Sequence, residues 1–239
     1  MQDTPETPGT GGPEPTPASP TPPPPPAAAS AYTGAAVGPR KGLFDRVRDI
    51  LIKPAAEWPV IDAEPATVGS VFVPYALILA AIGPLAGLIG GQVFGLNFGL
   101  FSWTPPIGTA ISMAVVGYVI SLATVFVLAL IIDALAPTFG GTKNQVNATK
   151  LAVYSWTAFW VAGIFGIIPA LAILGLVGLY SFYLLHLGLP VLMRVPQDKA
   201  SGYTVVVVLI AIVLYVLVSY VVYRALMGML IGAVVPGIR

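Results

Sequence analysis

Side chains able to do chemistry are scarce in the apolar part of this sequence, and they gather between residues 150 and 190. His186 is the single histidine, and ionisable groups inside apolar segments are costly and often functional. It is either a hydrogen-bonded structural histidine or part of a proton relay or lipid-headgroup contact. Four hydroxyl side chains accompany it and either bond neighbouring helices together or line a polar groove: Tyr154, Ser155, Tyr180 and Ser181.

The motifs of common catalytic and cofactor sites are missing from the sequence. It has no cysteine, no Gly-Lys-Ser/Thr phosphate loop, no His-Glu-x-x-His zinc motif and no serine-nucleophile elbow. We therefore expect no enzyme activity, no cofactor and no bound metal.

Composition assigns the class of protein. Charged residues make up 9% of the chain and apolar residues 56%, whereas soluble domains carry about 25% charged residues. Such a chain is expected to be an integral membrane protein, so its first partner is the lipid bilayer. The few charges give no support for nucleic-acid binding.

The candidate polar residues lie in a stretch from Leu151 to Met193 that contains no Asp, Glu, Lys or Arg. A single helix of this length would rise roughly 65 Å, about twice the thickness of a hydrocarbon core. The stretch is therefore expected to cross the membrane twice. Gly166 and Pro169 mark the turn, because glycine tolerates it and proline cannot donate to the helical hydrogen-bond ladder.

Two further apolar blocks complete the expected fold. One lies between Glu64 and Asp133, is long enough for two crossings and is interrupted around residues 97–106, and the last runs from Tyr203 to Tyr223. Because backbone polar groups in lipid must be satisfied internally, these blocks are expected to be helices. We predict an all-α bundle of five transmembrane helices in one domain, residues 42–235, with spans near 71–94, 107–130, 151–167, 170–193 and 203–223.

The first span carries a row of glycines spaced four residues apart. Small residues at this spacing let another helix backbone approach closely in lipid. The row either packs within the protein's own bundle or forms a dimer interface or a hinge. Its candidate interface residues are Gly83, Gly87 and Gly91, and Gly95 and Gly99 continue the spacing.

Two different segments precede the spans. Residues 1–38 are rich in Pro, Thr, Ala and Gly, cannot bury enough apolar surface to order, and are expected to form a disordered tail. From Leu43 to Leu51 the apolar residues fall on one helical face, which predicts a short amphipathic helix on the membrane surface.

Pro54 is expected to end that helix, and Trp58 to place its ring at the headgroup level. The alternative is that the segment around Trp58 docks a partner. Glu57, Trp58 and Glu64 are then the candidate contact residues.

The distribution of cations predicts the topology. Lysine and arginine precede the first span and also lie between the second and third spans and between the fourth and fifth, but the loops after the first and third spans have neither. The positive-inside rule then predicts a cytoplasmic N-terminus and an outside C-terminus. In a bacterium the protein would lie in the plasma (inner) membrane.

Several short motifs, in order along the chain, resemble the bacterial branch of the Yip1 family. They are Ala148–Ser155, Ile167–Ala170, Gly178–Ser181 and Gly188–Met193, with Pro54–Pro65 before the first span. The resemblance covers about residues 42–223 and implies a five-span helical protein with a cytoplasmic N-terminus. It brings no catalytic residues. Relatives often have a proline after the Tyr-Ser pair of the third span, where this chain has Trp156-Thr157-Ala158, so the kink expected there is in question.

Two functions from different classes remain open at this stage. The first is a non-enzymatic membrane scaffold that organises the membrane or binds other membrane proteins or a second copy of itself. Its support is the glycine row and the interfacial helix. The alternative is a permease for a small solute or ion, with a polar groove between the third and fourth spans.

Overall fold

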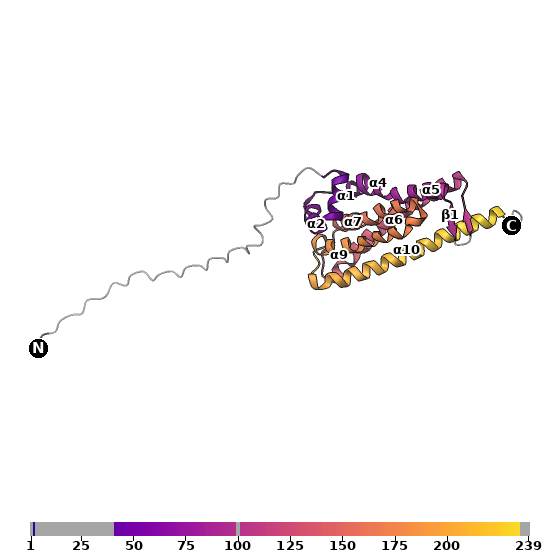
Figure 1. Ribbon diagram of the computed structural model, residues 1–239. Helices are drawn as coiled ribbons and strands as arrows, with labels where there is room; N and C mark the ends of the chain where they lie inside the picture. The colour runs from indigo at the N-terminus through magenta and orange to yellow at the C-terminus, as the bar shows by residue number, and fades with distance from the viewer. Residues whose placement is uncertain (1, 3–40, 99–100, 235–239) are drawn as a thin grey trace. The chain divides into compact units, whose positions relative to one another are not determined.

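The computed structural model describes residue 2, residues 41–98 and residues 101–234 of the chain. The chain divides into two units, Met1–Gly38 and Pro39–Arg239, and the predicted tail, residues 1–38, lies outside the described residues except for residue 2. In the second unit, five helical segments are long and apolar enough to cross a membrane: Val68–Val93, Ile107–Phe139, Gln145–Ile167, Pro169–Leu192 and Gln197–Val222. The prediction of a five-span α-helical membrane protein is confirmed (Figure 1).

The first span is built from four consecutive pieces, α3 (Val68–Val71), the π-helical turn η2 (Phe72–Ala76), α4 (Leu77–Ala80) and α5 (Ile82–Val93). Thr67 and Ser70 form a capping box at its start, which satisfies backbone N–H groups that the first helical turn leaves without partners. The widened turn η2 contains Pro74, which has no N–H to donate to the helical ladder.

Among residues 41–98 and 101–234, the connection to the second span is the one place where the chain forms strands. Gly95 has a φ of 73°, a left-handed conformation that favours glycine. It leads into a short antiparallel hairpin in which β1 (Leu96–Phe98) pairs with β2 (Phe101–Trp103). The second span follows as α6 (Ile107–Leu135), continued by η3 (Ala136–Phe139).

The third and fourth spans form the expected helical hairpin. The third consists of α7 (Gln145–Ser155), α8 (Thr157–Ala162) and η4 (Gly163–Ile167), and the fourth of η5 (Pro169–Leu179) and α9 (Tyr180–Leu192). Ile168 between them is extended, so the chain turns within the predicted Gly166–Pro169 segment. The fifth span begins α10 (Gln197–Val234).

Some helices are longer than the apolar blocks from which they were predicted. The third span starts at Gln145 rather than near residue 151, because the Asn144 side chain accepts hydrogen bonds from the amides of Val146 and Asn147 and caps the helix there. Lys150 therefore belongs to the helix and is buried.

Two helices, α1 (Leu43–Ile52) and α2 (Pro54–Ala63), precede the first span. Pro54 starts α2, since proline fits the first turn of a helix. The expectation that the Trp58 ring faces the lipid headgroups is wrong, because its side chain is fully buried. Gly188 of α9 explains the burial: a Cβ there would come within 2.8 Å of Trp58 Cε2, so only glycine leaves room for the indole.

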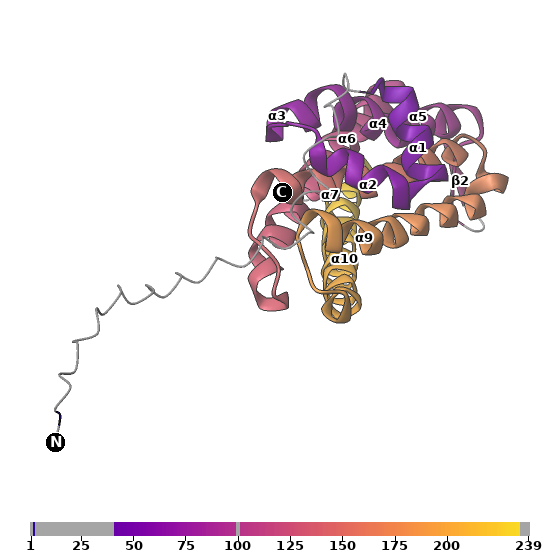
Figure 2. The ribbon, with the colours of Figure 1, turned by 90° about the vertical axis from the view of Figure 1, so that its left-hand side faces the viewer.

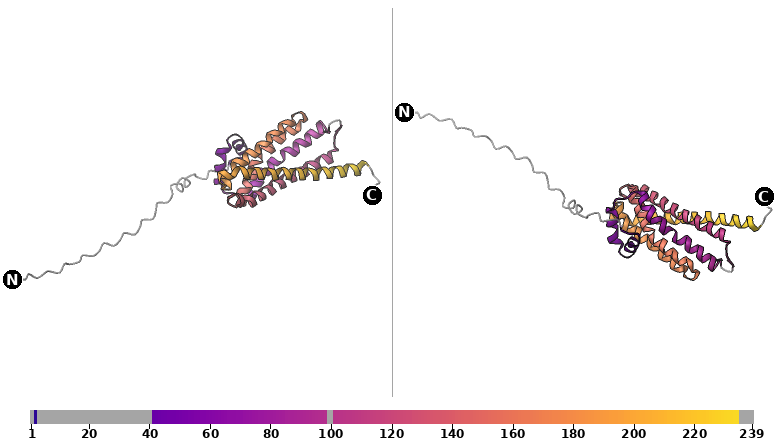
Figure 3. Two further views of the ribbon diagram at one scale, coloured as in Figure 1. Left: turned by 90° about the horizontal axis from the view of Figure 1, so that it is seen from below. Right: turned by 90° about the horizontal axis from the view of Figure 1, so that it is seen from above.

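The helices of this unit converge at one end and fan out at the other (Figure 3). The converging end carries α1 and α2, and Figure 2 looks onto it. There α2 packs against α9, and α7 packs between α6 and α9. Seven of the eleven residues of α7 are buried, so the third span is the centre of the core at this end.

Candidate functional site

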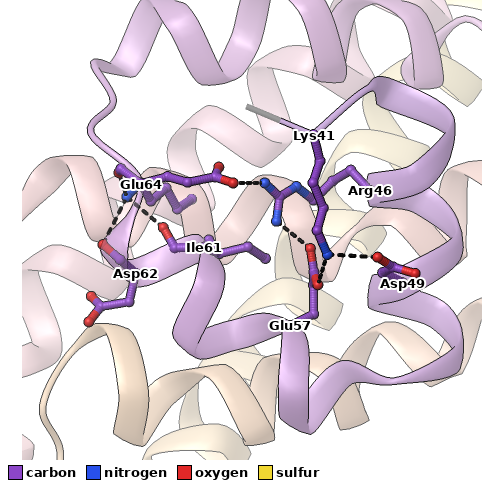
Figure 4. A network of polar contacts seen from close by, with 8 residues as sticks. Lys41, Arg46, Asp49, Glu57, Ile61, Asp62 and Glu64 are labelled. Carbon is purple, nitrogen blue, oxygen red and sulfur yellow. Dashed lines mark hydrogen bonds and ion pairs between the residues drawn. The ribbon is translucent and has the colours of Figure 1, made fainter. Parts of the chain in front are cut away.

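A network of buried ion pairs fixes α1 to α2 and the start of the first span (Figure 4). The guanidinium of Arg46 pairs with the carboxylates of Glu57 and Glu64. The side chains of Arg46 and Glu57 are only 3% and 4% exposed. Charges this deeply buried require partners. Here one guanidinium nitrogen of Arg46 faces Glu57 and the other faces Glu64.

Lys41 extends this network towards solvent. Its ammonium lies 2.7 Å from Asp49 Oδ2 and 2.6 Å from Glu57 Oε2. The hydrogen bonds from Lys41 lower the pKa of Asp49, and those same bonds to Asp49 and Glu57 raise the pKa of Lys41. Both groups therefore stay charged over the whole neutral range.

Lys150 of α7 holds the other end of α2. Its Nζ donates to the carbonyl oxygens of Ile61 at 2.8 Å and Glu64 at 2.6 Å, with that of Asp62 at 3.4 Å. The last carbonyls of a helix lack intrahelical partners and carry partial negative charge, so a cation there stabilises the helix end. Lys150 thus connects α2 to the third span.

Aromatic rings pack against the Arg46 ion-pair network. The Arg46 guanidinium carbon lies 5.6 Å from the centre of the Tyr154 ring, a distance suited to a cation–π interaction. Tyr154 in turn meets Tyr75 edge-on, and the hydroxyls of Tyr75 and Thr157 lie 2.8 Å apart. A cavity of about 90 Å³ remains beside Arg46, Lys150 and Tyr154.

The candidate contact residues of the segment before the first span all belong to this region, but they face inwards. Glu57 and Glu64 bind Arg46, and Trp58 packs against α9. A partner contact through these three side chains stays a prediction, and it would have to compete with contacts made inside the chain.

The five candidate groove residues lie in separate environments. Tyr154 lines the small cavity beside Arg46, and Ser155 is buried with no hydrogen-bond partner among the described residues. The Tyr180 hydroxyl donates to the Leu51 carbonyl at 3.2 Å. Ser181 accepts from the Phe159 amide at 3.0 Å, and His186 Nδ1 lies 3.0 Å from Thr204 Oγ1 on α10.

The glycine row of the first span is used unevenly within the chain. A Cβ on Gly163 would come within 2.9 Å of Gly83 Cα, so the first and third spans touch backbone to backbone there. Gly91 faces Leu96, whereas a Cβ on Gly87 would meet no heavy atom within 4 Å. The closest approach involves a residue outside the row, Gly90, whose added Cβ would lie 2.6 Å from two backbone oxygens of η4.

An apolar cavity of about 520 Å³ lies between α6, the third and fourth spans, and α10. We call it the lateral cavity. Its lining includes Gly117 and Ser121 of α6, Gly175 and Ser181 of the fourth span, and Ile212 of α10.

Arg46 and Lys150 were not among the residues singled out from the sequence. A signal for Arg46 exists: it lies four residues before Ile50 and three after Leu43, on the face that packs inwards. Lys150 is the last cation before the charge-free stretch Leu151–Met193, a position that marks it as part of a helix entering the membrane.

Comparison with known proteins agrees with this architecture. The family model described as Yip1 domain matches residues 48–220. Two curated relatives, both called inner membrane protein YohC and from two strains of Escherichia coli, are 27% identical over 160 residues, which cover 63% of this chain and 80% of each relative. No solved structure matches. The chain therefore belongs to the Yip1 domain family.

Proposed function

We propose that this protein is a non-enzymatic membrane scaffold that binds a transmembrane helix of a partner membrane protein. The binding surface is the lateral cavity. The observation that carries the proposal is the open space above two of its glycines, Gly117 of α6 and Gly175 of η5, where an added Cβ would meet no heavy atom within 4 Å.

Small residues matter here because helices in lipid associate through close packing rather than through a hydrophobic driving force. The glycines at the contacts inside the bundle, such as Gly163 and Gly90, already have another backbone against them. Gly117 and Gly175 do not, so they offer room for a helix from outside the chain.

Two of the polar groups of the lateral cavity fit the same occupant. The Ser121 hydroxyl accepts from the Trp160 indole N–H at 3.0 Å, and Ser181 accepts from the Phe159 amide at the same distance. Because these hydroxyls have partners inside the chain, the occupant needs to present mainly apolar surface.

Site-specific photo-crosslinking in native membranes tests the proposal. A photoreactive residue at Ile212, which lines the lateral cavity, is compared with one at Val216, a 60% exposed residue of α10 outside it. We expect position 212 to crosslink severalfold more efficiently, to one apolar helical segment of a partner protein. Gly117→Leu, which fills the cavity, should abolish the product, and Gly108→Leu on the same helix should not, because Gly108 also faces open space but lies outside the cavity.

Three results would contradict the proposal. Equal crosslinking at positions 212 and 216 would mean that the lateral cavity binds no specific partner helix. An adduct with the mass of a phospholipid alone would assign the cavity to an acyl chain. A crosslink between two copies of this chain would replace the partner by a homo-oligomer.

The permease interpretation requires Tyr154, Tyr180 and His186 to share one path. Tyr154 lies under Arg46, Tyr180 bonds to α1, and His186 faces Thr204 of α10. We therefore do not propose transport as a second function.

A further inference from the structure

The outward face of α1 has a composition that the amphipathic pattern did not predict. Arg46 and Ile50 point into the bundle, while Phe44 and Ile52 are 76% and 66% exposed. Arg48 is exposed between them, and positions four residues apart lie on the same side of a helix. The outer face of α1 is thus a cation flanked by two large apolar side chains.

Contacts along α9 give the depth of the α1–α2 turn. Tyr180, the first residue of α9, bonds to Leu51 at the end of α1; Gly188 packs on Trp58; and Arg194, beyond the end of α9, pairs with Asp62 at 2.7 Å. From Pro54 to Ala63, α2 therefore runs beside α9, starting in the inner part of the bundle and ending at the converging end. The start of α2 is therefore nearer the bilayer interior than its end.

The converging end extends beyond the hydrocarbon core. The 29 residues of α6 make a helix roughly 43 Å long, against about 30 Å for the core. Asp62, Glu64, Lys150 and Arg194 all lie at the converging end, and the loops at the opposite end carry no charge. The excess length therefore lies at the charged end, which puts α1 and α2 at headgroup depth.

The orientation of α1 is that of an interfacial helix. Leu43 at its start lines the small cavity with Val71 and Tyr75 of the first span, while Leu51 at its end bonds to Tyr180 of the fourth. The helix therefore crosses from one span to another instead of running along either. A helix in this position exposes one face to the bilayer interface along its whole length.

The cations on this face differ from the four basic residues that hold α1, α2 and the spans together at the same end. Lys41, Arg46 and Arg194 pair with carboxylates, and Lys150 binds carbonyl oxygens. Arg48 and Lys53 are exposed and make no ion pair with any acid of residues 41–98 or 101–234. Asp45 is the one other exposed charge of this face, so the face is net positive.

We infer that the outer face of α1 binds the headgroup of an anionic phospholipid. Arg48 and Lys53 contact the phosphate and the charged headgroup, and Phe44 and Ile52 enter the acyl region beside them. Charge complementarity selects anionic over zwitterionic lipid, since each Lys or Arg near such a surface adds about 1 kcal/mol of attraction. This inference is independent of the lateral cavity, which lies between other helices.

Lipid-dependent stability of the purified full chain in detergent provides the test. Phosphatidylglycerol should raise the unfolding temperature at lower concentration than phosphatidylcholine does. In Arg48→Gln/Lys53→Gln the apparent affinity for phosphatidylglycerol should fall by roughly thirtyfold. Lys143→Gln/Lys199→Gln, which removes two exposed lysines of other loops at the same end, should keep the parent affinity.

A second measurement locates the apolar side chains. The natural sequence has no cysteine, so spin labels can be placed singly at Phe44→Cys and Ile52→Cys in reconstituted bilayers, with the exposed loop position Thr142→Cys as control. Spin-label relaxation measures the accessibility of each label. The first two labels should be more accessible to oxygen, which enters lipid, than to a water-soluble nickel complex, and the control label should show the reverse. The inference is overturned if either label behaves like the control, if both charge variants lose affinity equally, or if the two lipids stabilise the parent equally.

Discussion

Arg46 and Glu57 form a buried ion pair between two short helices that precede the first membrane span. The pair draws in Lys41 and Glu64, so four charges meet where α1, α2 and the first span come together. Buried pairs of this kind add less to stability than their number suggests, because desolvation offsets the attraction. Their effect is to make one arrangement of α1 on α2 far better than any other.

Removing one member of the pair should be costly. Arg46→Ala leaves Glu57 buried without its main partner, and we expect a loss of about 3–5 kcal/mol in the free energy of unfolding. Arg48→Ala, two residues away and exposed, should change it by about 0.5 kcal/mol or less. Denaturant unfolding of the two variants in the same detergent is the measurement, and equal losses would show that Arg46 is not specifically held.

Glycine substitutions in the first span should separate packed from open positions. Gly90→Ala would place a methyl group 2.6 Å from the carbonyl oxygens of Gly166 and Ile167, so the first and third spans must move apart at a cost of about 1–3 kcal/mol. Gly87→Ala meets no neighbouring atom and should be neutral or stabilising by up to about 1 kcal/mol. Thermal unfolding of both variants distinguishes them, and a more stable Gly90→Ala would contradict the close contact.

Lys150 should control how firmly α2 is held. Lys150→Met keeps much of the side-chain volume but leaves the last carbonyls of α2 without their donor, which should cost about 1–3 kcal/mol. Hydrogen exchange should then become faster in α1 and α2 while α9 stays protected. Lys143→Met, at an exposed lysine of the preceding loop, is the control and should leave the exchange pattern of α2 unchanged.

The contribution of the Lys41–Asp49 pair to stability should be independent of pH near neutrality and should be lost at both extremes of pH. Asp49 has a pKa below its ordinary 3.8, so its contribution is present above that value and disappears as the pH falls through the folded-state pKa. Lys41 has a pKa above its ordinary 10.5, so its contribution is present below 10.5 and disappears as the pH rises through the folded-state value. The stability difference between the parent and Lys41→Gln should therefore be constant from about pH 5 to 9 and shrink outside that range.

The five spans could be predicted because they depend on length and charge alone. A charge-free stretch such as Leu151–Met193 is too long and too apolar to fold in water, whatever packs against it. The turn at Ile168 was also predictable, since Gly166 and Pro169 act on the local backbone. These features need no knowledge of the rest of the chain.

Burial before the first span could not be predicted in the same way. Nothing in the amphipathic pattern of Leu43–Leu51 indicated that Arg46 is buried, and Trp58 was expected to face the headgroups because it is aromatic. Both are buried because of residues far along the sequence, Tyr154 under Arg46 and Gly188 against Trp58. The glycine row illustrates the same limit: spacing identified Gly87 as readily as Gly83, but only the fold decides which one meets another backbone.

The contacts of Lys150 have a consequence for the order of assembly. Residues 61–64 are synthesised more than eighty positions before the lysine that caps them, and Leu51 precedes Tyr180 by 129. Contacts between segments so distant in sequence form slowly, because a long loop must close first. As the chain leaves the ribosome, α1 and α2 have nothing to dock on until the third and fourth spans have been inserted. Their docking is therefore a late step in folding, which can follow only after the helical hairpin of the third and fourth spans has formed.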